Sequence, residues 1–209
     1  MIVIVDYDTG NIKSVANAIS RLGAEYLLSS DPYVIRAADH VILPGVGEAS
    51  NAMQKLHQRG LDKLISTLSQ PVLGICIGLQ LMCLHSEEGN IHCMGIFDSK
   101  VKKFSCKNSF SGNERLNDNV SEEKIKIPHI GWNRIFSLSS PLFNGVDESS
   151  FVYYVHSYYP ELCKNTIATT EHGIKFSGAL NKENFYGTQF HPEKSGDVGE
   201  QILKNFMKI

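Results

Sequence analysis

The sequence lacks the features of membrane-spanning, secreted and nucleic-acid-binding proteins. Its most apolar stretch, residues 72–84, is shorter than the ~18–20 residues that a helix needs to cross a bilayer. The start of the chain has neither a basic region nor a long apolar segment, so we expect no signal peptide. Lys and Arg number 20 against 22 for Asp and Glu, and the net charge of −2 offers no basic surface to nucleic acid.

Cysteine is scarce and irregularly spaced. The five cysteines are odd in number and form no C-x-x-C pair, so we expect reduced thiols, no disulfide framework and a cytoplasmic location. The candidate metal ligands with the shortest spacing are Cys83, His85, His92 and Cys93. Their spacing matches no standard zinc pattern, so the sequence predicts no bound metal.

The overall composition is that of an ordinary globular protein, with 42% hydrophobic and 20% charged residues. The 209 residues suffice for one sizeable core, and we expect a single domain over residues 1–209. Residues 2–5 are a continuous β-branched run, which suits a strand buried on both faces. Ile12, Val15 and Ile19 then fall at helical spacing. This alternation continues to residue 85 and predicts a doubly wound α/β fold with a mostly parallel central sheet.

The expected boundaries follow from the same patterns. In the first half we expect strands at residues 2–5, 26–28, 41–43 and 72–75, and helices at 12–22, 49–68 (with a break at Gly60) and 77–85. In the second half, apolar runs at 100–104, 125–127, 151–155, 167–170 and 185–190 predict a mixed or antiparallel extension of the same sheet. Residues 105–124 are polar and aperiodic, which predicts a long surface loop, and a helix is expected to close the chain.

Residues 74–78, Gly-Ile-Cys-Ile-Gly, are the segment most informative about chemistry. A cysteine between two glycines, after a strand and before a helix, follows the pattern of a nucleophile on a sharp turn. We expect the glycines to relieve crowding, the helix N-terminus to favour the Cys76 thiolate, and the Ile77 N–H to face an oxyanion. The alternative is a buried structural cysteine in a glycine-containing turn.

Residues 44–47, Pro-Gly-Val-Gly, follow another buried strand. Their backbone N–H groups are expected at the same sheet edge, where they would form the other half of an oxyanion hole. The alternative is a dinucleotide fingerprint, because Gly45, Gly47 and Ser50 nearly match G-x-G-x-x-G. That match is poor, since Ser50 replaces the third glycine and the segment follows the third expected strand rather than the first.

His191 is the expected partner of Cys76. It ends an apolar strand that Pro192 terminates, and a histidine at a strand end can reach a nucleophile on a neighbouring strand. Glu193 is close enough in the chain to orient the imidazole and to stabilise its cation. A lone histidine is more often structural, and His156 is a competing base, but it lies in an aromatic run without an adjacent acid.

These segments together resemble the class I, or triad, glutamine amidotransferases. The resemblance is carried by residues 74–80 and 191–193, and it extends to residues 6–15, 44–47, 128–133, 153–158 and 188–195. Within the class, the Gly-Trp-Asn segment at 131–133 is similar to glutaminase subunits that supply ammonia to a histidine-biosynthesis enzyme. Two positions depart from the pattern: Asp8 stands where glycine is usual and Ile130 where methionine is common.

The resemblance implies a mechanism and a set of site residues. Cys76 would attack the side-chain amide of L-glutamine, His191 would protonate the leaving ammonia, and Glu193 would orient His191. The oxyanion would be held by backbone N–H groups of Gly45, Val46, Gly47 and Ile77. The amino-acid end of the substrate would bind at Gln80, Ser157 and Tyr158. No cofactor is implied.

The resemblance also implies a partner. Ammonia would pass into a (β/α)₈-barrel synthase subunit, with which the chain would form a heterodimer. The implied contact residues are Asn11, Trp132, Tyr153 and Lys194. One alternative is an amidotransferase subunit that supplies a different synthase, such as one acting on a sugar nucleotide. The other is a catalytically inactive regulatory protein with the same fold, against which the intact Cys76, His191 and Glu193 argue.

Overall fold

The structure is a computed structural model that describes residues 1–8, 12–105 and 125–209. A seven-stranded sheet lies at its centre, in the order β11-β12-β13-β4-β3-β1-β2. Its parallel strands are β1 (Ile2–Val5), β2 (Tyr26–Ser29), β3 (His40–Leu43), β4 (Val72–Ile75) and β13 (Phe185–Thr188). Strands β11 (Thr166–Glu171) and β12 (Lys175–Lys182) continue it antiparallel. The expected α/β fold with a mostly parallel central sheet is confirmed.

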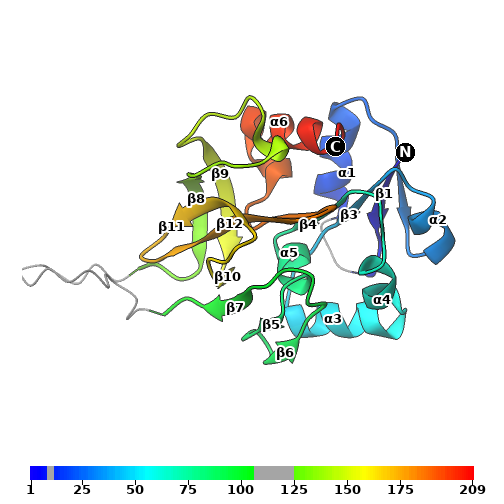
Figure 1. Cartoon of the computed structure of the whole chain (residues 1–209), viewed down its shortest axis with the longest axis horizontal. Coiled ribbons are helices and arrows are strands. Elements are labelled where there is room, and N and C mark those ends of the chain that lie inside the picture. Colours follow the sequence, from blue (N-terminus) through cyan, green and yellow to red (C-terminus); the bar gives the residue numbers. More distant parts are fainter. Residues whose placement is uncertain (9–11, 106–124) are drawn as a thin grey trace, which may run out of the picture.

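Helices cover both faces of the sheet (Figure 1). Helices α1 (Ile12–Arg21) and α6 (Gly196–Phe206) lie on one face, and α3 (Ala49–Gln58), α4 (Leu61–Ile65) and α5 (Ile77–Leu81) lie on the other. The short α2 (Pro32–Arg36) follows β2. All residues of β1, β4 and β13 are buried, which explains why their sequences are apolar runs rather than alternating patterns. None of the described helices is long and apolar enough to cross a membrane.

The second half of the chain adds two smaller sheets. One has the order β10-β7-β5-β6 and consists of β5 (His85–Ser86), β6 (Ile91–His92), β7 (Lys100–Lys103) and β10 (Tyr158–Pro160). The other pairs β8 (His129–Arg134) with β9 (Phe151–His156). The expected extension of the central sheet is therefore correct for β11 and β13, while β7 and β9 belong to the smaller sheets.

The expected helix at residues 49–68 is broken at Gly60, as predicted. Gly60 has φ +66°, a left-handed conformation that glycine adopts without the steric penalty of a Cβ atom. The break separates α3 from α4. Gly23, expected to end the first helix, has φ +73° and follows α1 directly after Leu22.

Three expected elements differ from the structure, and one strand was missed. The helix after Cys76 ends at Leu81 instead of residue 85, because the Leu84 N–H donates to the Ser99 carbonyl (2.9 Å) and the chain joins the sheet of β7. Residues 125–127 form no strand; the strand begins at His129, after Pro128, which has no N–H to donate. Strand β12 was not predicted, since its central residues are small and polar as well as apolar. Strand β13 ends at Thr188, so His191 lies just beyond it.

Two expectations lie outside the described residues. One is the partner contact at Asn11, and the other is most of the expected surface loop, residues 106–124.

Candidate active site

Cys76 lies on a sharp turn between β4 and α5. Its backbone has φ 54° and ψ −107°, a region that residues with a side chain rarely occupy. The surrounding hydrogen bonds hold this conformation from both sides: the Cys76 N–H donates to the Thr188 carbonyl (2.8 Å), and the Cys76 carbonyl accepts from the Gln80 N–H (3.1 Å). The strained turn places the thiol at the end of the parallel strands, where sites of α/β sheets are usually found.

The glycines around Cys76 are required by close packing of the backbone. A Cβ atom on Gly78 would lie 1.9 Å from the Leu43 carbonyl oxygen, and one on Gly74 would lie 2.7 Å from the Leu79 nitrogen. A Cβ atom on Gly45 would lie 2.4 Å from the Gly78 nitrogen. Gly45, after β3, therefore lies directly against the Cys76 turn, as the sequence predicts for residues 44–47.

His191 and Glu193 form a buried pair beside Cys76. The His191 Nδ1 atom lies 2.7 Å from the Glu193 Oε1 atom, and their side chains are 3% and 1% exposed. Burial alone would lower the pKa of His191, but the Cys76 thiolate and the Glu193 carboxylate, each through charge and a hydrogen bond, outweigh it and raise that pKa to about 10. The arrangement therefore favours a protonated imidazolium at His191 beside the Cys76 sulfur, with Nδ1–H directed to Glu193.

Backbone contacts hold this pair against β9. The His191 N–H donates to the Tyr153 carbonyl (2.9 Å), and the Ser195 hydroxyl donates to the His191 carbonyl (2.6 Å). The same Ser195 hydroxyl accepts from the Tyr153 N–H (3.0 Å). The position of His191 thus depends on β9, which also carries exposed side chains on its outer face.

A pocket of about 390 Å³ opens beside Cys76 and His191. Of the residues that the sequence singles out, the pocket walls include Val46, Gly47, Ile77, Gln80, Ser157, Tyr158 and Lys194. Gly45 lies against the turn, and neither Trp132 nor Tyr153 lines the pocket. Segments far apart in the sequence therefore meet around one thiol.

Gln80 is held by two hydrogen bonds at the wall of this pocket. Its Nε2 atom donates to the Tyr158 carbonyl (3.1 Å) and to the Gln189 Oε1 atom (2.8 Å). Its own Oε1 atom is buried and has no hydrogen-bond partner among the described residues. A buried acceptor of this kind is costly to leave unpaired, so it favours a ligand that brings a donor.

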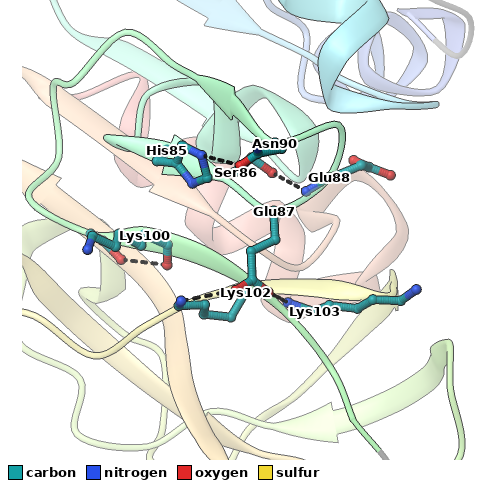
Figure 2. Close-up of polar contacts among 9 residues, drawn as sticks. His85, Ser86, Glu87, Glu88, Asn90, Lys100, Lys102 and Lys103 are labelled. Carbon is teal, nitrogen blue, oxygen red and sulfur yellow. Dashed lines mark hydrogen bonds and ion pairs between the residues drawn. The ribbon is translucent and has the colours of Figure 1, made fainter.

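Glu88 is a pocket residue that the sequence did not reveal. Its carboxylate accepts from the Ala49 N–H (2.9 Å) at the start of α3, and burial raises the pKa of Glu88. Figure 2 shows Glu87 directed toward Lys102 and Lys103, while Glu88 extends away from them. Adjacent acidic residues in a short turn carry no local signal that separates the surface carboxylate from the one in the pocket.

His156 is unsuited to be the base, although it lines the pocket. Its Nδ1 atom lies 2.7 Å from the Tyr158 carbonyl, to which it must donate, so its Nε2 atom accepts from the His129 Nδ1 atom (2.9 Å). Burial lowers the pKa of His156 to about 3. Both ring nitrogens are thus occupied and the ring is neutral, which favours a structural role.

The outer face of β8 and β9 is apolar and exposed. Trp132 pairs with Tyr153 and is 55% exposed, while Ile130 pairs with Val155 and is 56% exposed. Phe151, 47% exposed, extends this face. Contiguous apolar surface of this kind marks an interaction site more often than scattered single residues do. We call this surface, formed by Ile130, Trp132, Phe151, Tyr153 and Val155, the β8–β9 face.

The fold agrees with comparisons to known proteins. Residues 3–209 match the family Glutamine amidotransferase class-I, and the chain belongs to that family. It is 49% identical over 208 residues to imidazole glycerol phosphate synthase subunit HisH of Bacteroides fragilis (strain YCH46), covering 100% of this chain and 99% of that one. The HisH subunit of Yersinia pestis is 41% identical over 210 residues, with the same coverage. A solved structure of a glutamine amidotransferase has a TM-score of 0.70 at 15% identity, covering 100% of this chain and 98% of that chain.

Replacing Glu193 with glutamine is expected to reduce turnover about ten- to a hundredfold, which is less than the loss expected for Cys76→Ala. The amide keeps a hydrogen-bond acceptor for His191 Nδ1 but removes the charge that stabilises the imidazolium. Steady-state glutamine hydrolysis measures the effect, with Glu183→Gln on the surface as the matched control. Wild-type activity of Glu193→Gln would place the orienting carboxylate elsewhere.

Proposed function

We propose that this chain hydrolyses L-glutamine to glutamate and ammonia as the glutaminase subunit of an imidazole glycerol phosphate synthase. The observation that carries the proposal is Cys76 on its strained turn beside the buried His191–Glu193 pair, at the wall of a pocket with an acidic side chain. The full-length similarity to HisH subunits supports the choice of synthase.

The pocket offers partners for each end of glutamine. Glu88 and the unpaired Oε1 atom of Gln80 would accept hydrogen bonds from the α-ammonium group, and Ser157 and Tyr158 would contact the same end. The side-chain amide would then reach Cys76. Backbone N–H groups of Gly45, Val46, Gly47 and Ile77 would stabilise the oxyanion, since these segments converge on the turn.

The reaction proceeds in two halves. The Cys76 thiolate attacks the amide carbon, a C–S bond forms, and the carbonyl oxygen becomes an oxyanion. The imidazolium of His191 protonates the departing nitrogen, so the C–N bond breaks and ammonia leaves behind a thioester. His191 then removes a proton from water, which attacks the thioester, and the C–S bond breaks to release glutamate and restore the thiolate. Glu193 keeps the ring oriented throughout.

The second part of the proposal concerns the partner. The β8–β9 face lies on the strand whose Tyr153 carbonyl holds His191, so a protein bound there would lie next to the active site. Lys194 is exposed and lines the pocket, which suits an ion pair with the same partner. We propose that this partner is a (β/α)₈-barrel synthase subunit that receives the ammonia and forms a heterodimer with this chain. Neither a nucleic acid nor a membrane is part of the proposal.

Trp132→Ala is expected to weaken the complex about 30-fold, which corresponds to about 2 kcal/mol, because a desolvated aromatic side chain is a typical interface anchor. Glutamine hydrolysis is measured for the chain alone and with the barrel subunit and its ligand, at concentrations spanning the dissociation constant. The chain alone is expected to be nearly inactive, since the partner would favour the active arrangement of residues 44–47. Tyr33→Ala, at an aromatic residue 85% exposed on α2, is the control.

Two results would contradict the partner proposal. One is full glutaminase activity of the chain alone, and the other is a Trp132→Ala chain whose affinity and activation match those of Tyr33→Ala. A third result is activation by a barrel subunit that consumes a different substrate, such as a sugar nucleotide. In that case the proposed glutaminase activity stands and the proposed identity of the synthase is wrong.

A further inference from the structure

Gln189 is a buried residue that has no role in the proposed mechanism and that the sequence patterns did not indicate as part of the site. It directly follows β13, is 0% exposed, and donates its backbone N–H to the Gly178 carbonyl (2.8 Å). Its side chain lies between Gln80 and Cys76. The Oε1 atom of Gln189 accepts from Gln80 Nε2 (2.8 Å), and its Nε2 atom donates to the Cys76 sulfur at 3.6 Å.

The surrounding groups fix which end of each amide faces which neighbour. The carbonyl of Tyr158 can only accept, so Gln80 must present its amino group there. The same amino group of Gln80 donates to Gln189, so Gln189 presents its carbonyl to Gln80. The amino group of Gln189 is left to face the sulfur. The backbone carbonyl of Tyr158 thereby sets the orientation of a donor two side chains away.

A hydrogen-bond donor at this position would stabilise a thiolate at Cys76. Cys76 is only 4% exposed, so its thiolate receives little stabilisation from water and depends on nearby donors. His191 is one such donor, and its side chain is buried with that of Glu193. Gln189 supplies a second, uncharged donor from the direction of Gln80.

We propose that Gln189 is a further catalytic residue, which stabilises the Cys76 thiolate through its amide N–H. The contact exists without substrate, and only its effect on turnover rests on the proposed glutaminase function. In the first half of the reaction, the donor increases the fraction of nucleophilic thiolate. In the second half, the C–S bond breaks and its electron pair returns to sulfur, where the same N–H stabilises the leaving group.

The test measures alkylation of Cys76 by iodoacetamide from pH 5 to pH 10 on the full chain, with peptide mapping to separate Cys76 from the other cysteines. Gln189→Met removes the donor while keeping a side chain of similar length. We expect about tenfold slower alkylation at pH 7 and a midpoint at higher pH, because a hydrogen bond to a charged group is lost. Gln70→Glu, at a residue that contacts Ile35 on another part of the chain, is expected to match the wild type.

Gln189→Glu is the second variant: it keeps an acceptor for Gln80 and exchanges the amide donor for a carboxylate, whose charge adds repulsion to the loss of the hydrogen bond, so alkylation slower than in Gln189→Met is expected. Slower alkylation in both variants supports the proposal. A wild-type pH profile for Gln189→Met overturns it, and so does slower alkylation in Gln189→Met alone, which would assign the effect to the Gln80 contact. Near-ultraviolet circular dichroism confirms that each variant is folded. A failure of the glutaminase proposal is distinguishable, since the wild-type chain would then release no ammonia from glutamine whatever the alkylation profile.

Discussion

Replacing Cys76 with alanine is expected to lower kcat for glutamine hydrolysis by about 10⁴-fold or more, since a reaction through a thioester cannot proceed without the nucleophile. The loss is measured on the complex with the proposed barrel subunit, where we expect the wild-type rate to be highest. Cys163→Ala is the control, because Cys163 is a half-buried cysteine that lies outside the pocket. Its activity is expected to remain close to that of the wild type.

The same thiol is expected to be the site of covalent labelling by a glutamine-analogue electrophile. Burial raises the pKa of Cys83, and burial also raises the pKa of Cys93 to about 12, so both remain protonated and unreactive at neutral pH. Among the four cysteines that the structure describes, only Cys76 combines a strained turn with the imidazolium of His191. Labelling that persists in the Cys76→Ala chain would remove the basis of the mechanism.

Gly78→Ala is expected to lower the free energy of unfolding by about 3 kcal/mol or more and to abolish activity. The added Cβ atom would lie 1.9 Å from the Leu43 carbonyl oxygen, a backbone atom that cannot move without displacing β3. That displacement would also disturb residues 44–47, which follow β3 and supply the proposed oxyanion site. Urea denaturation measures the stability, and glutamine hydrolysis measures the activity.

Gly23→Ala provides the comparison for this variant. Gly23 has φ +73° and no atom within 4 Å of an added Cβ, so alanine there meets conformational strain but no steric overlap. We expect a loss of about 1 kcal/mol and unchanged activity. Equal losses in the two variants would show that β3 can move away from the turn, contrary to the packing described.

Sequence patterns predicted the elements whose environment is simple. Strands buried on both faces, such as β1 and β4, are continuous apolar runs, and Gly60 marks the break between α3 and α4. The errors fall where the environment is mixed. Strand β8 exposes Ile130 and Trp132 and buries His129, so its apolar residues do not indicate a core strand. The helix after Cys76 stops early because the Leu84 N–H donates to the Ser99 carbonyl, next to β7, instead of continuing the helix.

The sequence by itself determined the central α/β sheet, the Cys76 turn and the short His191–Glu193 segment. Each of these leaves a signature in residues close together in the chain, so local spacing is enough to indicate it. Only the tertiary structure decided which other groups surround the thiol. Glu88 reaches the pocket through its contact with Ala49, and Gln189 is oriented by Gln80 and the Tyr158 carbonyl. These contacts join residues tens of positions apart, and the burial that gives them their effect exists only once the sheets have packed together.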